Sequence, residues 1–238
     1  MTQLHYKSPS VHASCGCAGL PRRGFLAAGA AAVAAGGALA FAAPRARAQS
    51  ALSPQAALDQ LMAGNARFVR GRLDSFQEDL DILKQGTTEK QEPFAAVLSC
   101  ADSRVPVELV FDQSIGHVFV ARVAGNIVTS EIIASLEYGA AVLGTKAIMV
   151  LGHEGCGAVK AAIAGKAVPG QISALYRPLR AAVEQAGTDV EAACKANARI
   201  QANLLATSSP VIADMVKQGA VKVVAAYYAL ATGQVTLL

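Results

Sequence analysis

Two short segments of this chain carry side chains that could together bind a metal ion. The first has Cys100, Asp102 and Arg104 at alternate positions, and the second begins at His153 and reaches Cys156 three residues later. Two thiolates and one imidazole are the ligand count of a catalytic zinc site, whereas structural zinc sites are closed by four protein ligands. Thiolate softness also favours zinc. The sequence therefore predicts an open metal site beside a paired carboxylate and guanidinium.

The two segments can meet only if the strands before them are neighbours. Residues 93–99 form a compact apolar run without helical period, typical of a buried strand, and residues 146–151 form another. Each segment follows the carboxyl end of its run, where open α/β sheets bind ligands. A His-x-x-Cys pair alone is weak evidence for a metal site, because a buried cysteine is more often a small apolar side chain than a ligand. The coincidence of both segments with strand ends favours the metal.

The rest of the chain alternates between strand-like runs and amphipathic segments. A first helix should begin at Ser53-Pro54, an N-cap followed by a helix-compatible proline, and end near Gly71. Residues 75–92 suit a second short helix and a loop. Other strands are expected at 118–121, 221–228 and 234–238, and other helices at 129–144, 158–164, 171–206 (two helices) and 211–218. Strands separated by helices predict one α/β domain with a mainly parallel central sheet flanked by helices.

Charge is distributed unevenly along the 238 residues. The formal net charge is +4, but residues 1–48 hold five basic and no acidic side chains, so the remainder carries 16 basic and 17 acidic ones. A near-neutral body without tryptophan gives no reason to expect a nucleic-acid partner. A hydrophobic fraction of 53% also argues against a disordered chain.

The basic residues belong to what looks like a targeting segment. Arg22-Arg23 precede an apolar run rich in alanine and glycine, residues 24–43, and this pattern resembles a twin-arginine export signal. Ala46-Arg47-Ala48 suits cleavage before Gln49. We therefore expect a leader at 1–48, a mature domain at 49–238 in the periplasm, and no membrane contact after cleavage. An uncleaved anchor is the alternative, since about 18 apolar residues can span a bilayer.

Several motifs together resemble those of the β-class carbonic anhydrases. The similarity extends over about residues 53–238 in one collinear order. The matching pieces are Cys100-Ala-Asp102-Ser-Arg104, Phe119-Val-Ala-Arg122-Val-Ala-Gly125-Asn126, Gly152-His153-Glu-Gly-Cys156-Gly157, and the segments at 61–68 and 228–233. The resemblance implies a zinc enzyme that interconverts CO₂ and bicarbonate.

It also implies roles for the residues of the metal site. Cys100, His153 and Cys156 resemble the family's ligands for one zinc ion per subunit, and Asp102 and Arg104 resemble its catalytic pair. Arg104 would hold Asp102 away from the metal by bidentate hydrogen bonds. In some family members the aspartate instead ligates zinc in a closed state at lower pH.

The resemblance suggests a substrate pocket and an assembly as well. Five residues resemble substrate-contacting or pocket-lining positions of relatives: Gln91, Phe119, Ala124, Tyr138 and Gly157. Family members form dimers with the pocket at the interface, so Gln91 and Phe119 could serve the neighbouring subunit. A homodimer or a larger homo-oligomer is the expected assembly.

The remaining cysteines, and His117 in the expected mature domain, have simpler interpretations. Cys15 and Cys17 should leave with the leader, and Cys194 should be a buried or free thiol. His117 could shuttle protons, but a histidine without a paired acid is more often a surface residue.

Three alternative functions stay open. A hydrolase of carbon disulfide or carbonyl sulfide would use the same residues behind a different access tunnel. A non-catalytic zinc-binding or bicarbonate-sensing module would not need Asp102 and Arg104, which are both present. A periplasmic thiol-redox protein would use Cys100 and Cys156 without metal.

Overall fold

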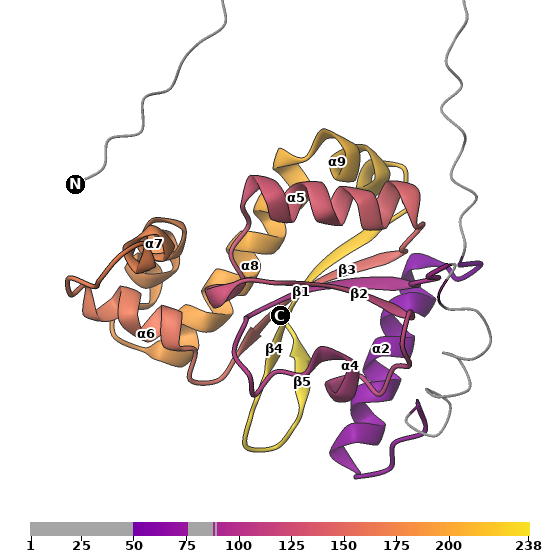
Figure 1. Ribbon diagram of the computed structural model, residues 1–238, viewed down its shortest axis with the longest axis horizontal. Helices are drawn as coiled ribbons and strands as arrows, with labels where there is room; N and C mark the ends of the chain where they lie inside the picture. Colours follow the sequence, from indigo (N-terminus) through magenta and orange to yellow (C-terminus); the bar gives the residue numbers. More distant parts are fainter. Residues whose placement is uncertain (1–49, 76–87, 89) are drawn as a thin grey trace, which may run out of the picture. The chain divides into compact units, whose positions relative to one another are not determined.

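The computed structural model describes residues 50–75, 88 and 90–238, and a five-stranded sheet with the order β2-β1-β3-β4-β5 forms its centre (Figure 1). The strands are β1 (Ala95–Ser99), β2 (Val118–Arg122), β3 (Ala147–His153), β4 (Lys222–Tyr228) and β5 (Val235–Leu237). The pairs β1–β2, β1–β3 and β3–β4 are parallel, and β5 pairs antiparallel with β4. The expected mainly parallel sheet is confirmed.

Helices cover both faces of this sheet (Figure 1). The described α-helices are α2 (Pro54–Val69), α4 (Val107–Val110), α5 (Ser130–Glu137), α6 (Gly157–Ala164), α7 (Tyr176–Ala186), α8 (Val190–Ser208) and α9 (Pro210–Lys217). α2 and α4 lie on one face, α5, α8 and α9 lie on the other, and α6 and α7 pack beside α8. Successive residues of a strand face opposite sides. Ala95 and Val97 of β1 accordingly pack in the cluster that includes α2 and α4, while Ala96 and Leu98 pack with α5, α8 and α9.

Local sequence signals explain several element boundaries. The Ser53 side chain accepts from the N–H of Ala56 and Pro54 starts α2, as expected. Thr129 caps α5 in the same way, through the N–H of Ile132. The expected helix at 129–144 is found, but it is α-helical only to Glu137 and continues as a π-helical turn, Tyr138–Val142. β3 ends two residues later than expected and includes His153, so this side chain stands on the strand itself.

Some predictions fall on other parts of the chain. The expected leader, residues 1–48, and most of the expected short helix and loop at 75–92 lie outside the described residues. Among the residues that the structure describes, no helix has the length and apolar character needed to cross a membrane.

Candidate active site

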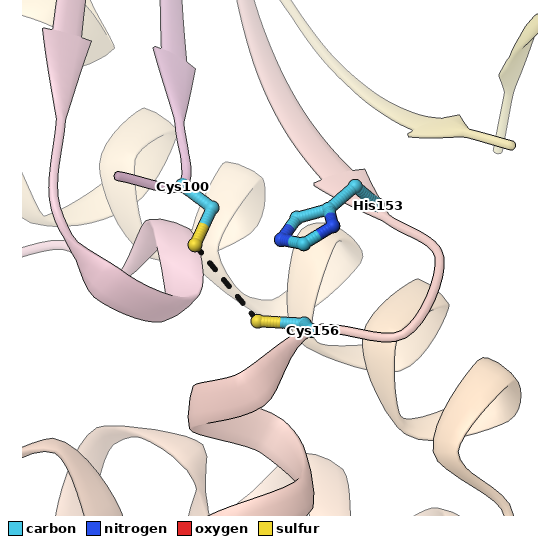
Figure 2. A group of neighbouring side chains, drawn as sticks. All are labelled: Cys100, His153 and Cys156. Carbon is cyan, nitrogen blue, oxygen red and sulfur yellow. Dashed lines mark hydrogen bonds between the residues drawn. The ribbon is translucent and has the colours of Figure 1, made fainter. Parts of the chain in front are cut away.

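Cys100, His153 and Cys156 converge at the carboxyl ends of two neighbouring parallel strands (Figure 2). Cys100 follows β1, His153 ends β3, and Cys156 is the N-cap of α6; the paired strands end side by side, with Ser99 opposite Leu151. The three potential ligand atoms lie within 4.8 Å of one another and all three residues are buried. The predicted meeting of the two segments is confirmed.

The spacing of the two sulfur atoms suits a shared metal ion. Both cysteines are free thiols, and their Sγ atoms are 3.9 Å apart. Two thiolates at about 2.3 Å from one tetrahedral zinc ion would be separated by roughly 3.8 Å. The observed separation therefore matches a pair of ligands.

The imidazole of His153 offers a nitrogen to the same point. Its Nδ1 is 2.9 Å from the carbonyl oxygen of Glu154, and since a carbonyl only accepts, Nδ1 carries the hydrogen. Nε2 therefore keeps its lone pair, and this buried atom has no hydrogen-bond partner among the described residues. A buried polar atom without a partner is costly unless something binds it. The donor set fits a metal ion.

Electrostatics at the cysteines agree with that fit. The hydrogen bond with Cys156 and burial raise the pKa of the Cys100 thiol to about 12, although His153 and the Gly125 N–H act in the opposite direction. Without a cation, this buried pair is therefore held in its neutral form. A divalent cation would supply the charge that allows both sulfurs to ionise.

Asp102 and Arg104 form an ion pair next to this group. Oδ1 of Asp102 accepts from the backbone N–H and the Nε of Arg104, both at 2.9 Å, and Oδ2 accepts from Nη2 at 2.7 Å. The hydrogen bonds from Arg104 hold the pKa of Asp102 well below its usual range, against the effect of burial. Oδ2 lies 4.0 Å from Nε2 of His153. An ionised carboxylate therefore stands beside the candidate metal position with both oxygens engaged by Arg104.

Arg122 has a role that the sequence did not reveal. Its Nε donates to the carbonyl of Cys100 at 3.0 Å and its Nη2 to the carbonyl of Asp102 at 2.6 Å. Arg122 ends β2, beside the end of β1, so it can hold the loop that carries both residues. Its place at a neighbouring strand end was the available signal, but carbonyl acceptors cannot be read from a sequence.

Glu154 is a second residue with an unforeseen role. Its carbonyl orients His153, its N–H donates to the carbonyl of Tyr228 at 2.9 Å, and its Oε2 accepts from the N–H of Ala231 at 3.2 Å. The residue after the histidine is thus tied to the connection between β4 and β5. This anchorage keeps the accepting carbonyl in place.

The five expected substrate-contacting residues are not all brought together. Gly157 begins α6 directly after Cys156, and Ala124 precedes Gly125, whose N–H donates to Cys100 Sγ at 3.3 Å. Gln91 is exposed and precedes β1, so it lies near the opposite end of that strand from Cys100.

Phe119 and Tyr138 form a pair on the edge of the sheet. Their ring centroids are 6.4 Å apart, and Tyr138 is 49% exposed. Phe119 is in register with Ala96, four residues before Cys100, which corresponds to about 13 Å along a strand. Within one chain, therefore, neither Gln91 nor this aromatic pair encloses the metal group.

The other singled-out side chains have simpler surroundings. Cys194 of α8 is a buried free thiol, as expected, and it packs in the same cluster as Cys100 and Cys156. His117 is half-buried, and its carbonyl accepts from the N–H of Phe94.

These features define a class of protein: an α/β fold whose sheet presents an open Cys₂His group and an Asp–Arg pair at strand carboxyl ends. The family model described as carbonic anhydrase matches residues 95–235. A carbonic anhydrase of Pseudomonas aeruginosa is 31% identical over 187 residues, covering 72% of this chain and 84% of that protein. The chain belongs to the carbonic anhydrase family.

Further relatives place the fold within the β class. Carbonic anhydrase 2 of Mycobacterium tuberculosis is 45% identical over 112 residues. The match covers 47% of this chain and 54% of that relative, so the chain spans about half the length of the relative. The solved β-carbonic anhydrase CcaA is 26% identical with a TM-score of 0.62, covering 76% of this chain and 86% of that one. A Coccomyxa β-carbonic anhydrase in complex with acetazolamide is also 26% identical, with a TM-score of 0.58 and coverages of 68% and 78%.

Proposed function

We propose that this protein is a zinc-dependent carbonic anhydrase that interconverts CO₂ and bicarbonate. The observation that carries the proposal is the buried Cys₂His group, whose sulfurs are 3.9 Å apart, with an ionised Asp102 beside it. Cys100, His153 and Cys156 would hold one zinc ion per subunit. Bound zinc would supply the Lewis acidity that activates water in sites of this ligand count.

The chain's own residues would orient and protect that chemistry. Arg104 keeps Asp102 ionised and engages both of its oxygens, so this carboxylate would be held from closing the metal site as a fourth protein ligand. A carboxylate with such a low pKa is a weak base and stays unprotonated near neutral pH. Oδ2 of Asp102 would instead accept a hydrogen bond and so orient a reacting group beside His153.

Stopped-flow measurement of CO₂ hydration tests the proposal. The zinc-loaded protein should accelerate hydration, and removal of zinc with a chelator should abolish the acceleration. A zinc-loaded protein without activity from acidic to alkaline pH would rule it out. Parallel assays with carbonyl sulfide and carbon disulfide would show whether a CO₂ analogue is the preferred substrate.

We also propose that a second copy of the chain completes the substrate pocket, in a homodimer or larger assembly. The support is the position of Gln91, Phe119 and Tyr138, which lie at the far end or outer edge of the sheet relative to Cys100. Within the described part of the chain, β2 is the edge strand of the parallel sheet, and no other strand pairs with its outer side. The solved Sordaria macrospora β-carbonic anhydrases, which share the fold, are described as tetrameric. Analytical ultracentrifugation should find at least a dimer, and a monomer with full activity would refute this part.

Finally, we propose that residues 1–48 are a twin-arginine leader and that residues 49–238 act in the periplasm. The support is Arg22-Arg23 before an apolar segment and the small residues at 46 and 48. Mass spectrometry of the exported protein should find Gln49 at its N-terminus, and Arg22→Lys with Arg23→Lys should retain the protein in the cytoplasm. An N-terminus at Met1 in an exported protein would contradict cleavage.

A further inference from the structure

Two buried polar side chains of α8 reach Cys100 through the backbone of Gly125. Asn197 and Gln201 are each 1% exposed and lie one helical turn apart. Nδ2 of Asn197 donates to the carbonyl of Gly125 at 2.8 Å, and the N–H of Gly125 donates to Sγ of Cys100 at 3.3 Å. A continuous series of hydrogen bonds therefore connects the interior of α8 with a candidate metal ligand.

Gln201 fixes the orientation of the Asn197 amide. Nε2 of Gln201 donates to Oδ1 of Asn197 at 3.1 Å and to the carbonyl of Pro178 at 3.2 Å. Because Oδ1 of Asn197 is the acceptor, its Nδ2 must face Gly125. Oε1 of Gln201 accepts from the N–H of Val128 at 2.8 Å. The two amides thus hold both ends of the segment 125–128, and fully satisfied buried networks of this kind are rigid.

The backbone at Gly125 suits this close approach. Its φ of +76° lies in the left-handed region that favours glycine. A Cβ at this position would lie 3.3 Å from the Cβ of Ala158 and 3.4 Å from Cδ1 of Leu179. Gly125 is therefore packed closely against residues of α6, α7 and α8, and its N–H points at Sγ of Cys100.

We propose that Asn197, oriented by Gln201, is a positioning residue that aims the Gly125 N–H at Cys100 and so tunes the bond of this thiolate to the metal. A hydrogen bond to a ligating sulfur draws electron density from it, and partners outside the ligand set tune both affinity and electronic properties of metal sites. Two amides in an otherwise apolar helix face are also costly unless each is satisfied. The inference rests on the metal-binding part of the proposed function.

Asn197→Leu tests the proposal, because leucine has a similar size and removes the amide. With Co²⁺ in place of zinc in the full chain, the thiolate-to-cobalt charge-transfer absorption should move to longer wavelength, since the Cys100 sulfur becomes more electron-rich. Zinc affinity, measured by competition with a chelator, should fall about 10-fold. Asn197→Ala serves as a second variant if leucine prevents folding.

Asn65→Leu is the matched control. Asn65 is 3% exposed, and its amide donates to the carbonyls of Val110 and Gly233 and accepts from the N–H of Val235. This variant should lower the thermal stability to a similar degree, with an unchanged cobalt spectrum and zinc affinity.

The proposal is overturned if both Asn197 variants keep the native absorption and zinc affinity, or if Asn65→Leu changes them equally. Neither readout requires CO₂. A protein that shows the expected cobalt response without hydrating CO₂ would therefore contradict the proposed activity and leave this inference in place.

Discussion

The metal site and the outer edge of the sheet differ in how much of their surroundings one chain supplies. Around Cys100, Arg122 of β2 donates to its carbonyl and Gly125, in the segment after β2, donates to its Sγ. Asn197 of α8 in turn holds Gly125, and the three ligand side chains are buried. Around Phe119, by contrast, the ring packs on Tyr138, which is 49% exposed. The candidate metal ligands are thus preorganised within one chain, whereas the proposed apolar pocket would need another copy to complete it.

This contrast follows from the topology of the sheet. β1 and β3 are interior parallel strands, so their carboxyl ends are fixed by neighbours on both sides. Among the residues that the structure describes, β2 pairs with a strand on one side only. Cys100 and His153 therefore stand at the ends of interior strands, whereas the Phe119 ring, whose contact with Tyr138 is apolar, stands on the edge strand.

Removing a metal ligand should produce the largest effect. His153→Ala removes the imidazole, whose Nε2 lies near the two cysteine sulfurs. Mutation of residues that only hydrogen-bond to metal ligands costs roughly 10–100-fold in affinity, so the loss of zinc affinity in this variant should be larger. Metal analysis after gel filtration checks this. A variant that retains one zinc per chain would show that the three residues are not the ligand set.

Removing the carboxylate beside the metal should separate binding from turnover. Asp102→Asn should keep zinc and lower the turnover number about 100-fold or more, because the ionised acceptor is lost. Stopped-flow kinetics and metal analysis on the same sample measure both quantities. Glu108→Gln, which changes an exposed carboxylate on α4, is the control and should match the native protein. Equal rates for the native protein and Asp102→Asn would remove Asp102 from the catalytic machinery.

A substitution at the sheet edge should weaken dimer formation and leave zinc binding unchanged. Phe119→Ala removes the ring that packs on Tyr138 and should raise the dimer dissociation constant at least about 5-fold, as expected for an interface anchor. Sedimentation at several concentrations measures this, and zinc content should stay at one per chain. Loss of zinc from Phe119→Ala would mean that the edge and the metal site are not independent.

A carboxylate away from the metal group should affect stability with little effect on activity. Asp112 is 2% exposed and accepts hydrogen bonds from Arg67, Ser75 and the backbone of Asp74. Burial acts to raise the pKa of Asp112, but the hydrogen bonds from Ser75, Arg67 and Asp74 outweigh it and hold the pKa at about 2.

Because this pKa is lower in the folded than in the unfolded chain, the stabilisation is present above about pH 4 and is lost as the pH falls toward 2. Asp112→Asn should therefore lower the free energy of unfolding by about 2 kcal/mol at neutral pH, with a smaller difference in acid. Urea unfolding at several pH values measures this. A constant difference at every pH would contradict the electrostatic explanation.

The sequence predicted the fold class and the metal group because both depend on periodic or local signals. Apolar runs marked β1 and β3, and the residues after each run were enough to bring Cys100 and Cys156 together. The prediction was less accurate where tertiary contacts decide. The last part of the expected helix at 129–144 is a π-helical turn, and β3 extends to His153 through its pairing with β4.

Contacts to the backbone were the part that sequence could not supply. Arg122, Glu154 and Asn197 act through carbonyl or N–H groups, whose positions depend on how distant segments pack. Gln91 and Phe119 were assigned by resemblance to relatives, and their place in a pocket remains a prediction that depends on a second chain.

X-ray absorption spectroscopy at the zinc edge tests the central claim most directly. The open Cys₂His site predicts two sulfur atoms at about 2.3 Å and two nitrogen or oxygen atoms at about 2.0–2.1 Å around each zinc. Cys194 is a further buried free thiol and packs in the same cluster as Cys100 and Cys156, so it is the sulfur that the measurement must exclude. Three sulfur neighbours would indicate a closed structural zinc and contradict the account.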